Sequence, residues 1–132
     1  MQVEHIGIAV KDLEAGNALY ARLLGQPHYK IETVDSEYVN TSFFRAGATK
    51  IELLEATHPD STIARFIEKR GEGIHHIALQ VDDLDASLDE LKQMNVQLID
   101  QRPRIGAEDK RIAFIHPKAT GGILVELSES KK

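Results

Sequence analysis

Two histidines and two glutamates stand at matching places in the two halves of this sequence. "HIGIAVKDLEA" begins at His5 and "HIALQVDDLDA" at His76, while "KIELLE" contains Glu52 and "LVELSE" contains Glu126. The histidines are 76 − 5 = 71 residues apart and the glutamates 126 − 52 = 74, a difference that loops can absorb. Imidazole nitrogens and carboxylate oxygens bind divalent ions of hard or borderline character. If the two halves pair by pseudo-twofold symmetry, the four side chains form one metal site.

Each of these residues also has an ordinary interpretation when it is taken alone. A strand histidine is more often a hydrogen-bonded core or rim residue than a ligand, and a strand glutamate is usually solvated. Their coincidence at equivalent positions of a repeat favours the metal site. Strand alternation then selects between His75 and His76, because neighbours point to opposite faces and only His76 matches His5. Glu55 and Glu129, three residues beyond the predicted ligands, are expected on the opposite face as surface carboxylates.

The elements that must position these residues follow a repeated βαβββ plan. In the first half, residues 3–10 alternate as a strand, Asp12 starts a helix that Gly25 ends, and three strand segments follow within residues 28–56. In the second half, a strand over 74–81 precedes a helix over about 85–94 and the strands "VQLI", "RIAFIH" and "ILVELSE". The helix "TIARFIEKR" connects the halves. We predict one domain over 1–132, with module 1 at about 1–57, the connecting helix at about 60–71 and module 2 at about 73–130.

Composition and charge exclude several classes of protein. With 132 residues, of which 42% are hydrophobic, the chain can bury a real core. A net charge of −5 argues against a basic surface for nucleic acid or for an anionic membrane. The absence of cysteine excludes disulfides and thiolate metal sites, so a metal must be held by His, carboxylate or amide. With no long apolar run and no basic-then-apolar leader, the expected location is the cytoplasm.

Three longer stretches carry a family resemblance: "EHIGIAVKDLEA", "KIELLEATHPDSTIARFIEKRGEGIHHIALQVDDLDA" and "RIAFIHPKATGGILVELSE". They make the chain similar to the methylmalonyl-CoA epimerase family of the vicinal oxygen chelate superfamily over almost its whole length. "GIHHIALQVDD" and "HPK…GGILVEL" are the specific parts. The resemblance implies an α+β fold in which two pseudo-symmetric βαβββ modules form a curved mixed β-sheet cleft. It also implies the metal ligands His5, Glu52, His76 and Glu126, and some members carry Gln in place of Glu52.

The activity that this resemblance implies is that of an isomerase acting on an acyl-CoA. The α-carbon of (2R)- or (2S)-methylmalonyl-CoA loses a proton on one face and regains one on the other, through an enolate stabilised by a divalent ion. Four protein ligands leave two open positions on octahedral cobalt, manganese or nickel, whereas tetrahedral zinc must expand its shell. Cobalt is the first expectation. Glu126 is expected to act both as ligand and as one base.

The second acid or base is where this chain departs from the family pattern. The strand "YVNTSFF", where some members place a glutamate, has no carboxylate. Glu37, at the start of that strand, is the nearest candidate, and a bound water or a different route for the second proton is the alternative. At the other end of the substrate, Lys118 of "HPK", together with Arg111 or Lys110, is expected to meet CoA phosphates.

Two other functions compete with the epimerase. A glyoxalase I type lactoylglutathione lyase resembles this chain in its duplicated fold and its His, Glu, His, Glu ligand set, but its last strand usually follows an acidic "DPDG"-like turn where this chain has "HPKATGG". A non-catalytic small-molecule-binding protein of the same fold, such as a drug-sequestering protein, needs no complete ligand set. Superfamily members often dimerise, so a homodimer is expected.

Overall fold

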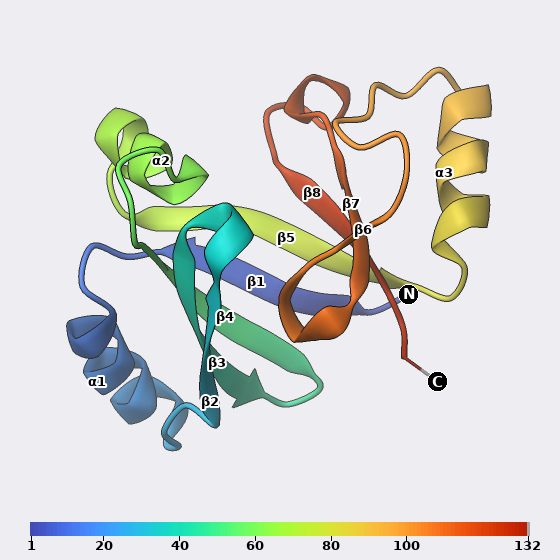
Figure 1. Ribbon diagram of the computed structural model, residues 1–132. Coiled ribbons are helices and arrows are strands. Elements are labelled where there is room, and N and C mark those ends of the chain that lie inside the picture. The colour runs from blue at the N-terminus through green and yellow to red at the C-terminus, as the bar shows by residue number, and fades with distance from the viewer. Residues whose placement is uncertain (132) are drawn as a thin grey trace. The chain divides into compact units, whose positions relative to one another are not determined.

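The computed structural model describes residues 1–131, and its elements follow a repeated order (Figure 1). The first part contains β1 (Val3–Ala9), α1 (Leu13–Leu24), β2 (Lys30–Val34), β3 (Val39–Ala46), β4 (Thr49–Ala56) and then α2 (Thr62–Arg70). The second part contains β5 (Gly73–Val81), α3 (Leu84–Gln93), β6 (Arg104–Ile105), β7 (Arg111–Ile115) and β8 (Val125–Glu129). The prediction of an α+β fold built from two βαβββ modules is confirmed.

The chain divides into two compact units. One unit comprises residues 5–75, and the other comprises residues 1–4 with residues 76 onward. Each unit therefore contains the sheet, the helix and the His–Glu pair of one module. Among the described residues, no helix has both the length and the apolar character needed to cross a membrane.

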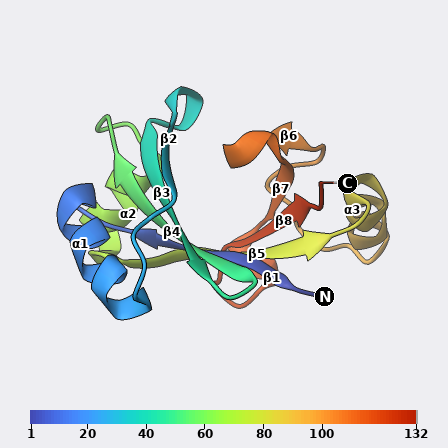
Figure 2. The ribbon, with the colours of Figure 1, turned by 90° about the horizontal axis from the view of Figure 1, so that it is seen from below.

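In the unit of residues 5–75, the strands lie in the order β2-β3-β4-β1. β1 runs parallel to β4, and β3 runs antiparallel to β2 and β4, so the sheet is mixed. Helix α1 lies beside these strands (Figure 2). It begins at the N-cap Asp12, whose side chain accepts from the Ala15 N–H, and it ends at Gly25 with a φ of 74°.

Two helices cover parts of the two faces of this sheet. Against one face, α1 encloses a cluster of buried apolar residues: Val10, Leu13, Phe44 and Leu53. Against the other face, α2 encloses a second cluster: Ala9, Val39, Leu54 and Ile63. Because Leu53 and Leu54 are neighbours on β4, their presence in different clusters shows which face each helix covers.

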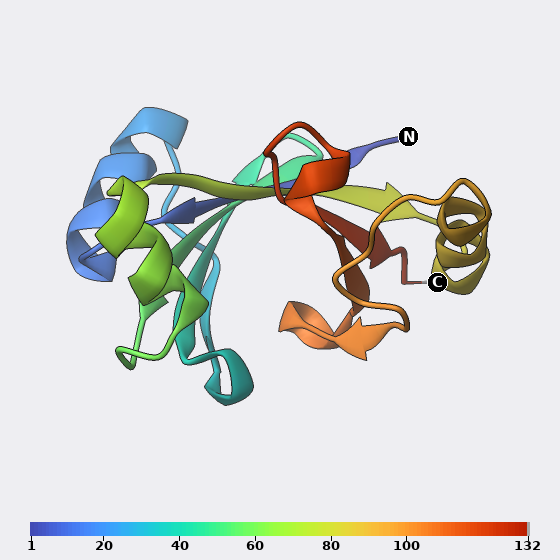
Figure 3. The same ribbon diagram turned by 90° about the horizontal axis from the view of Figure 1, so that it is seen from above.

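In the second unit, the strands lie in the order β5-β8-β7-β6, with β5 parallel to β8 and the other pairs antiparallel. Helix α3 begins at the N-cap Asp83 and lies alongside β7 and β8 (Figure 3). The core beneath it consists of Val81, Leu84, Leu88, Leu98, Ala113, Ile115 and Leu127.

One predicted strand of the second module is wrong. "VQLI" forms a bridge between Leu98 and Ile115 rather than a strand, and the short edge strand is β6, in the segment between "VQLI" and "RIAFIH". The reason lies at Asp100, whose carboxylate accepts from the Phe114 N–H at 2.8 Å. A side chain thus occupies the place of the backbone acceptor that would continue the ladder.

The prediction for Glu55 and Glu129 as surface carboxylates needs correction. Glu55 Oε2 accepts from the Leu13 N–H at 2.7 Å, and Glu129 Oε2 accepts from the Leu84 N–H at 2.9 Å. Each carboxylate therefore reaches from the last strand of its module to the first turn of the module's own helix, where unpaired N–H groups favour an anion. Their equivalence in the repeat was visible in the sequence, but the helix ends that they cap were not.

We expect Glu55→Ala to lower the free energy of unfolding by about 1 kcal/mol, because it removes a charged acceptor from the N-terminus of α1. Denaturant unfolding followed by circular dichroism measures this change. Glu68→Ala, at an exposed position of α2, is the matched control and should stay within about 0.5 kcal/mol of the parent protein. An equal loss in both variants contradicts the capping role.

Candidate metal centre

The first His–Glu pair lies on neighbouring parallel strands of the unit of residues 5–75. Gly7 on β1 stands opposite Glu52 on β4, so His5, two residues before Gly7, presents its side chain to the same face as Glu52. His5 Nδ1 lies 3.0 Å from Glu52 Oε2. Both residues are buried, with 5% and 4% of their surface exposed. The pair therefore offers a nitrogen and carboxylate oxygens from a position largely shielded from solvent.

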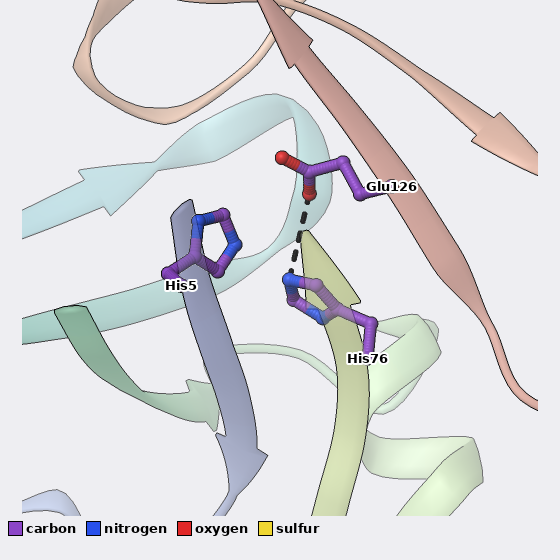
Figure 4. Close-up of side chains that lie close together, drawn as sticks. All are labelled: His5, His76 and Glu126. Atoms are coloured by element: carbon purple, nitrogen blue, oxygen red, sulfur yellow. Dashed lines mark ion pairs between the residues drawn. The ribbon is translucent and has the colours of Figure 1, made fainter. Parts of the chain in front are cut away.

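The second pair repeats this arrangement in the other unit. Ala78 on β5 stands opposite Glu126 on β8, and His76 lies two residues before Ala78. His76 Nε2 lies 3.4 Å from Glu126 Oε1, and 6% and 5% of the two residues are exposed (Figure 4). The Phe114 ring meets the His76 ring edge-on, with 5.8 Å between centroids. His5, drawn in the same figure, belongs to the first pair.

Both pairs lie on the sheet face that their module's own helix leaves uncovered. In the first unit α1 packs on the side of Leu53, the neighbour of Glu52. In the second unit α3 packs on the side of Leu127, the neighbour of Glu126. Strand alternation thus places each pair on the face opposite the one that its module's own helix covers, and in the first unit this face also carries the cluster under α2.

The buried donor set suits a divalent metal ion. Burial of a carboxylate costs free energy unless a partner or a metal compensates its charge. His5, His76, Glu52 and Glu126 are of the residue types that can hold a metal ion, and all four are buried. Nitrogen and oxygen donors without sulfur fit borderline to hard ions rather than soft ones. The described residues therefore include a possible metal site.

His75, the neighbour of His76, has a different environment. Its ring lies edge-on to Phe66 of α2, with 5.1 Å between centroids. Burial lowers the pKa of His75 from its ordinary value of 6.5 to about 4, so the imidazole is neutral at neutral pH. The two adjacent histidines thus offer a matched pair of positions for substitution.

The three cations considered for CoA phosphates differ in their contacts and in their exposure to solvent. Lys110 Nζ lies 2.9 Å from Glu4 Oε2, and 14% of its side chain is exposed. Arg111 binds Asp85 at 2.9 Å and Glu129 at 3.1 Å, and hydrogen bonds to these carboxylates raise its pKa. Lys110 and Arg111 are therefore already paired with carboxylates of the protein. Lys118 is exposed, on a short turn at Pro117–Ala119.

Comparisons with known proteins agree with this architecture. The model of the Glyoxalase/Bleomycin resistance protein/Dioxygenase superfamily matches residues 4–114. The Bacillus subtilis protein YqjC is 45% identical over 130 residues, which are 98% of this chain and 93% of that protein. The ethylmalonyl-CoA/methylmalonyl-CoA epimerase of Cereibacter sphaeroides is 39% identical over 130 residues, which are 97% of each protein.

A solved structure of a methylmalonyl-CoA epimerase in complex with methylmalonyl-CoA and NH4+ is also similar. It has a TM-score of 0.92 and 34% identity, and the match covers 98% of this chain and 94% of that chain. Together these likenesses define the class, and the chain belongs to the Glyoxalase/Bleomycin resistance protein/Dioxygenase superfamily. Within that superfamily it belongs to the methylmalonyl-CoA epimerase family, whose members are isomerases.

Proposed function

We propose that this chain is a methylmalonyl-CoA epimerase in which His5, Glu52, His76 and Glu126 hold one divalent metal ion. The observation that carries the proposal is the repeated His–Glu pair, buried at equivalent places in both modules of a chain from this family. In each pair a histidine nitrogen and a carboxylate oxygen are within 3.4 Å of each other. Two such pairs supply four donors to a single ion.

The donor set favours a metal that accepts six ligands. When bound, the ion would act as a Lewis acid and stabilise negative charge on the thioester oxygen. Two His and two Glu leave two positions of an octahedral ion for oxygens of the substrate. We therefore propose Co²⁺ first, then Mn²⁺ or Ni²⁺, while Zn²⁺ would have to exceed its usual four ligands.

Within this site, Glu126 carries one of the two proton transfers. A carboxylate has two oxygens, so one can bind a metal while the other accepts the α-proton of the acyl group. His76 fixes the Glu126 side chain by its contact at 3.4 Å, and Phe114 supports the imidazole. Glu52 holds the equivalent place beside His5, with its carboxylate 3.0 Å from Nδ1, and we assign it the role of ligand only.

The acyl-CoA substrate extends from this site toward solvent. We assign Lys118 to the CoA phosphates, because it is an exposed cation on a turn, while Lys110 and Arg111 bind carboxylates of the protein. A Lys118→Ala variant with an unchanged KM would remove this assignment. A homodimer is also part of the proposal, since superfamily members often dimerise, and a cytoplasmic location stays a prediction from the sequence.

Turnover of two substrates by the same cobalt-loaded preparation tests the function. We expect conversion of (2S)- to (2R)-methylmalonyl-CoA. A coupled reaction that consumes only one epimer, with chromatography of the products, measures this conversion. No conversion of the hemithioacetal of methylglyoxal and glutathione is expected. Turnover of the hemithioacetal alone would contradict the proposal and favour a glyoxalase I type lyase, and the absence of both reactions would favour a binding protein.

A further inference from the structure

The first unit has no carboxylate on β3 at the face that carries Glu52. Phe43 stands directly opposite Glu52 in the antiparallel ladder, so the two side chains share a face. Thr41 lies two residues from Phe43 and points to this face as well. An epimerase that inverts its substrate needs an acid or base on each side of the α-carbon. Glu126 provides one of them, and β3 does not provide the other.

Glu32 on the neighbouring strand β2 lies on this same face. It stands directly opposite Thr41 in the antiparallel ladder. Side chains at such positions have Cβ atoms about 4.5–5.5 Å apart and point the same way. The alternation is visible one residue further on, where Thr33 and Asn40 form a hydrogen bond at 2.6 Å on the opposite face. Glu32 is thus displaced by one strand from the position of Thr41.

Lys30 forms an ion pair with Glu32 and lies in the same row of residues across the sheet as Glu52. Lys30 stands opposite Phe43, and Phe43 stands opposite Glu52, so these three residues form one row across the sheet. Lys30 Nζ lies 4.8 Å from the centre of the Phe43 ring and 3.6 Å from Glu32 Oε2. Glu32 keeps 32% of its side-chain surface exposed, so its carboxylate is paired with Lys30 and also accessible to a ligand.

Two other carboxylates of this unit accept backbone N–H groups, and a third lies outside the sheet. Glu55 accepts from the Leu13 N–H, and Glu72 accepts from the Lys11 N–H at 2.7 Å. Glu37 lies in the short helical turn Asp35–Glu37 between β2 and β3, outside the ladder that aims side chains at the face of Glu52.

We infer that Glu32 is the second acid/base of the epimerisation, an inference that rests on the proposed function. From one epimer, the α C–H bond breaks, its proton forms an O–H bond with the Glu32 carboxylate, and the electron pair stays on the substrate as an enolate. The protonated Glu126 then gives its proton to the opposite face of the α-carbon. For the other epimer the two residues exchange roles, so atoms and charge balance in both directions.

The test uses each pure epimer of methylmalonyl-CoA in deuterated buffer with the cobalt-loaded Glu32→Gln variant. We expect epimerisation to fall by a factor of about 100 or more, the usual contribution of a positioned acid or base. One epimer should still exchange its α-proton at close to the parent rate, because Glu126 can remove and return a proton on its own side. Cobalt affinity, measured by calorimetry, should be unchanged, and Glu68→Gln is the matched control.

Several outcomes overturn the assignment. Unchanged epimerisation in Glu32→Gln excludes Glu32, and equal loss of exchange from both epimers shows a structural role instead. If Glu37→Gln loses exchange from one epimer only and Glu32→Gln does not, Glu37 is the second acid/base instead of Glu32. Failure of the proposed function is distinguishable, because the parent protein itself would then exchange no α-proton from either epimer in the presence of metal.

Discussion

His76→Ala is expected to abolish tight binding of the single divalent ion that the parent protein takes up. The variant loses one of two imidazole donors and leaves Glu126 buried without its neighbour at 3.4 Å. Loss of an outer partner of a metal ligand already costs about 10–100-fold in affinity, so loss of a ligand should exceed about 100-fold. Titration calorimetry with Co²⁺ on metal-free protein measures both affinity and stoichiometry.

The adjacent histidine supplies the control for this prediction. His75→Ala should keep one tight site per chain, because the His75 ring packs against Phe66 and belongs to neither His–Glu pair. His5→Ala should reproduce the loss seen for His76→Ala, since one ion shared by both modules needs both imidazoles. Two equivalents of metal in the parent protein, with each variant losing only one, would show two separate sites and contradict the shared centre.

Glu126→Gln is expected to have the second large effect, a loss of epimerisation of about 100-fold to 10,000-fold, because the amide cannot accept the α-proton. Glu52→Gln should retain most of the activity, since an amide oxygen can still bind the metal and some family members carry Gln there. The two glutamates hold equivalent places in the repeat, each on a strand parallel to that of its histidine, so the comparison separates the proton transfer from metal binding. Initial rates at saturating substrate and cobalt measure it.

A loss of epimerisation rate that is not larger in Glu126→Gln than in Glu52→Gln would contradict this assignment. Equal losses in Glu52→Gln and Glu126→Gln would indicate that both glutamates act as ligands only. A larger loss in Glu52→Gln would place the base in the first module instead. Cobalt affinity measured in parallel shows whether either change in rate comes from loss of metal rather than from loss of a base.

The sequence predicted the His–Glu pairs because a duplication repeats their positions. His5 and Glu52 could each be explained as ordinary strand residues, but His76 and Glu126 stand at the same places in the second copy. The structure shows what this repetition encodes, a histidine two residues before the partner of a glutamate on a parallel strand. The order of strands and helices followed from the same repetition and from caps such as Asp12.

The features that sequence reasoning missed depend on the pairing of distant segments. Glu129 accepts from the Leu84 N–H at the start of α3 and binds Arg111. Leu84 and Glu129 are far apart in the sequence, so their hydrogen bond could not be predicted from it. The failure of "VQLI" to form a strand depends on Asp100 reaching Phe114. The position of Glu32 opposite Thr41 requires the register of β2 on β3, which strand propensity does not specify.

The most direct test of the metal-dependent epimerase is exchange of the α-proton of methylmalonyl-CoA with deuterated solvent, followed by NMR. The purified protein is measured after chelation and again after one equivalent of cobalt is added. A metal-dependent epimerase should show no measurable exchange in the chelated protein and rapid exchange once cobalt is restored. Exchange that is equally fast in the chelated protein would contradict the metal centre, and no exchange with any divalent ion would contradict the epimerase.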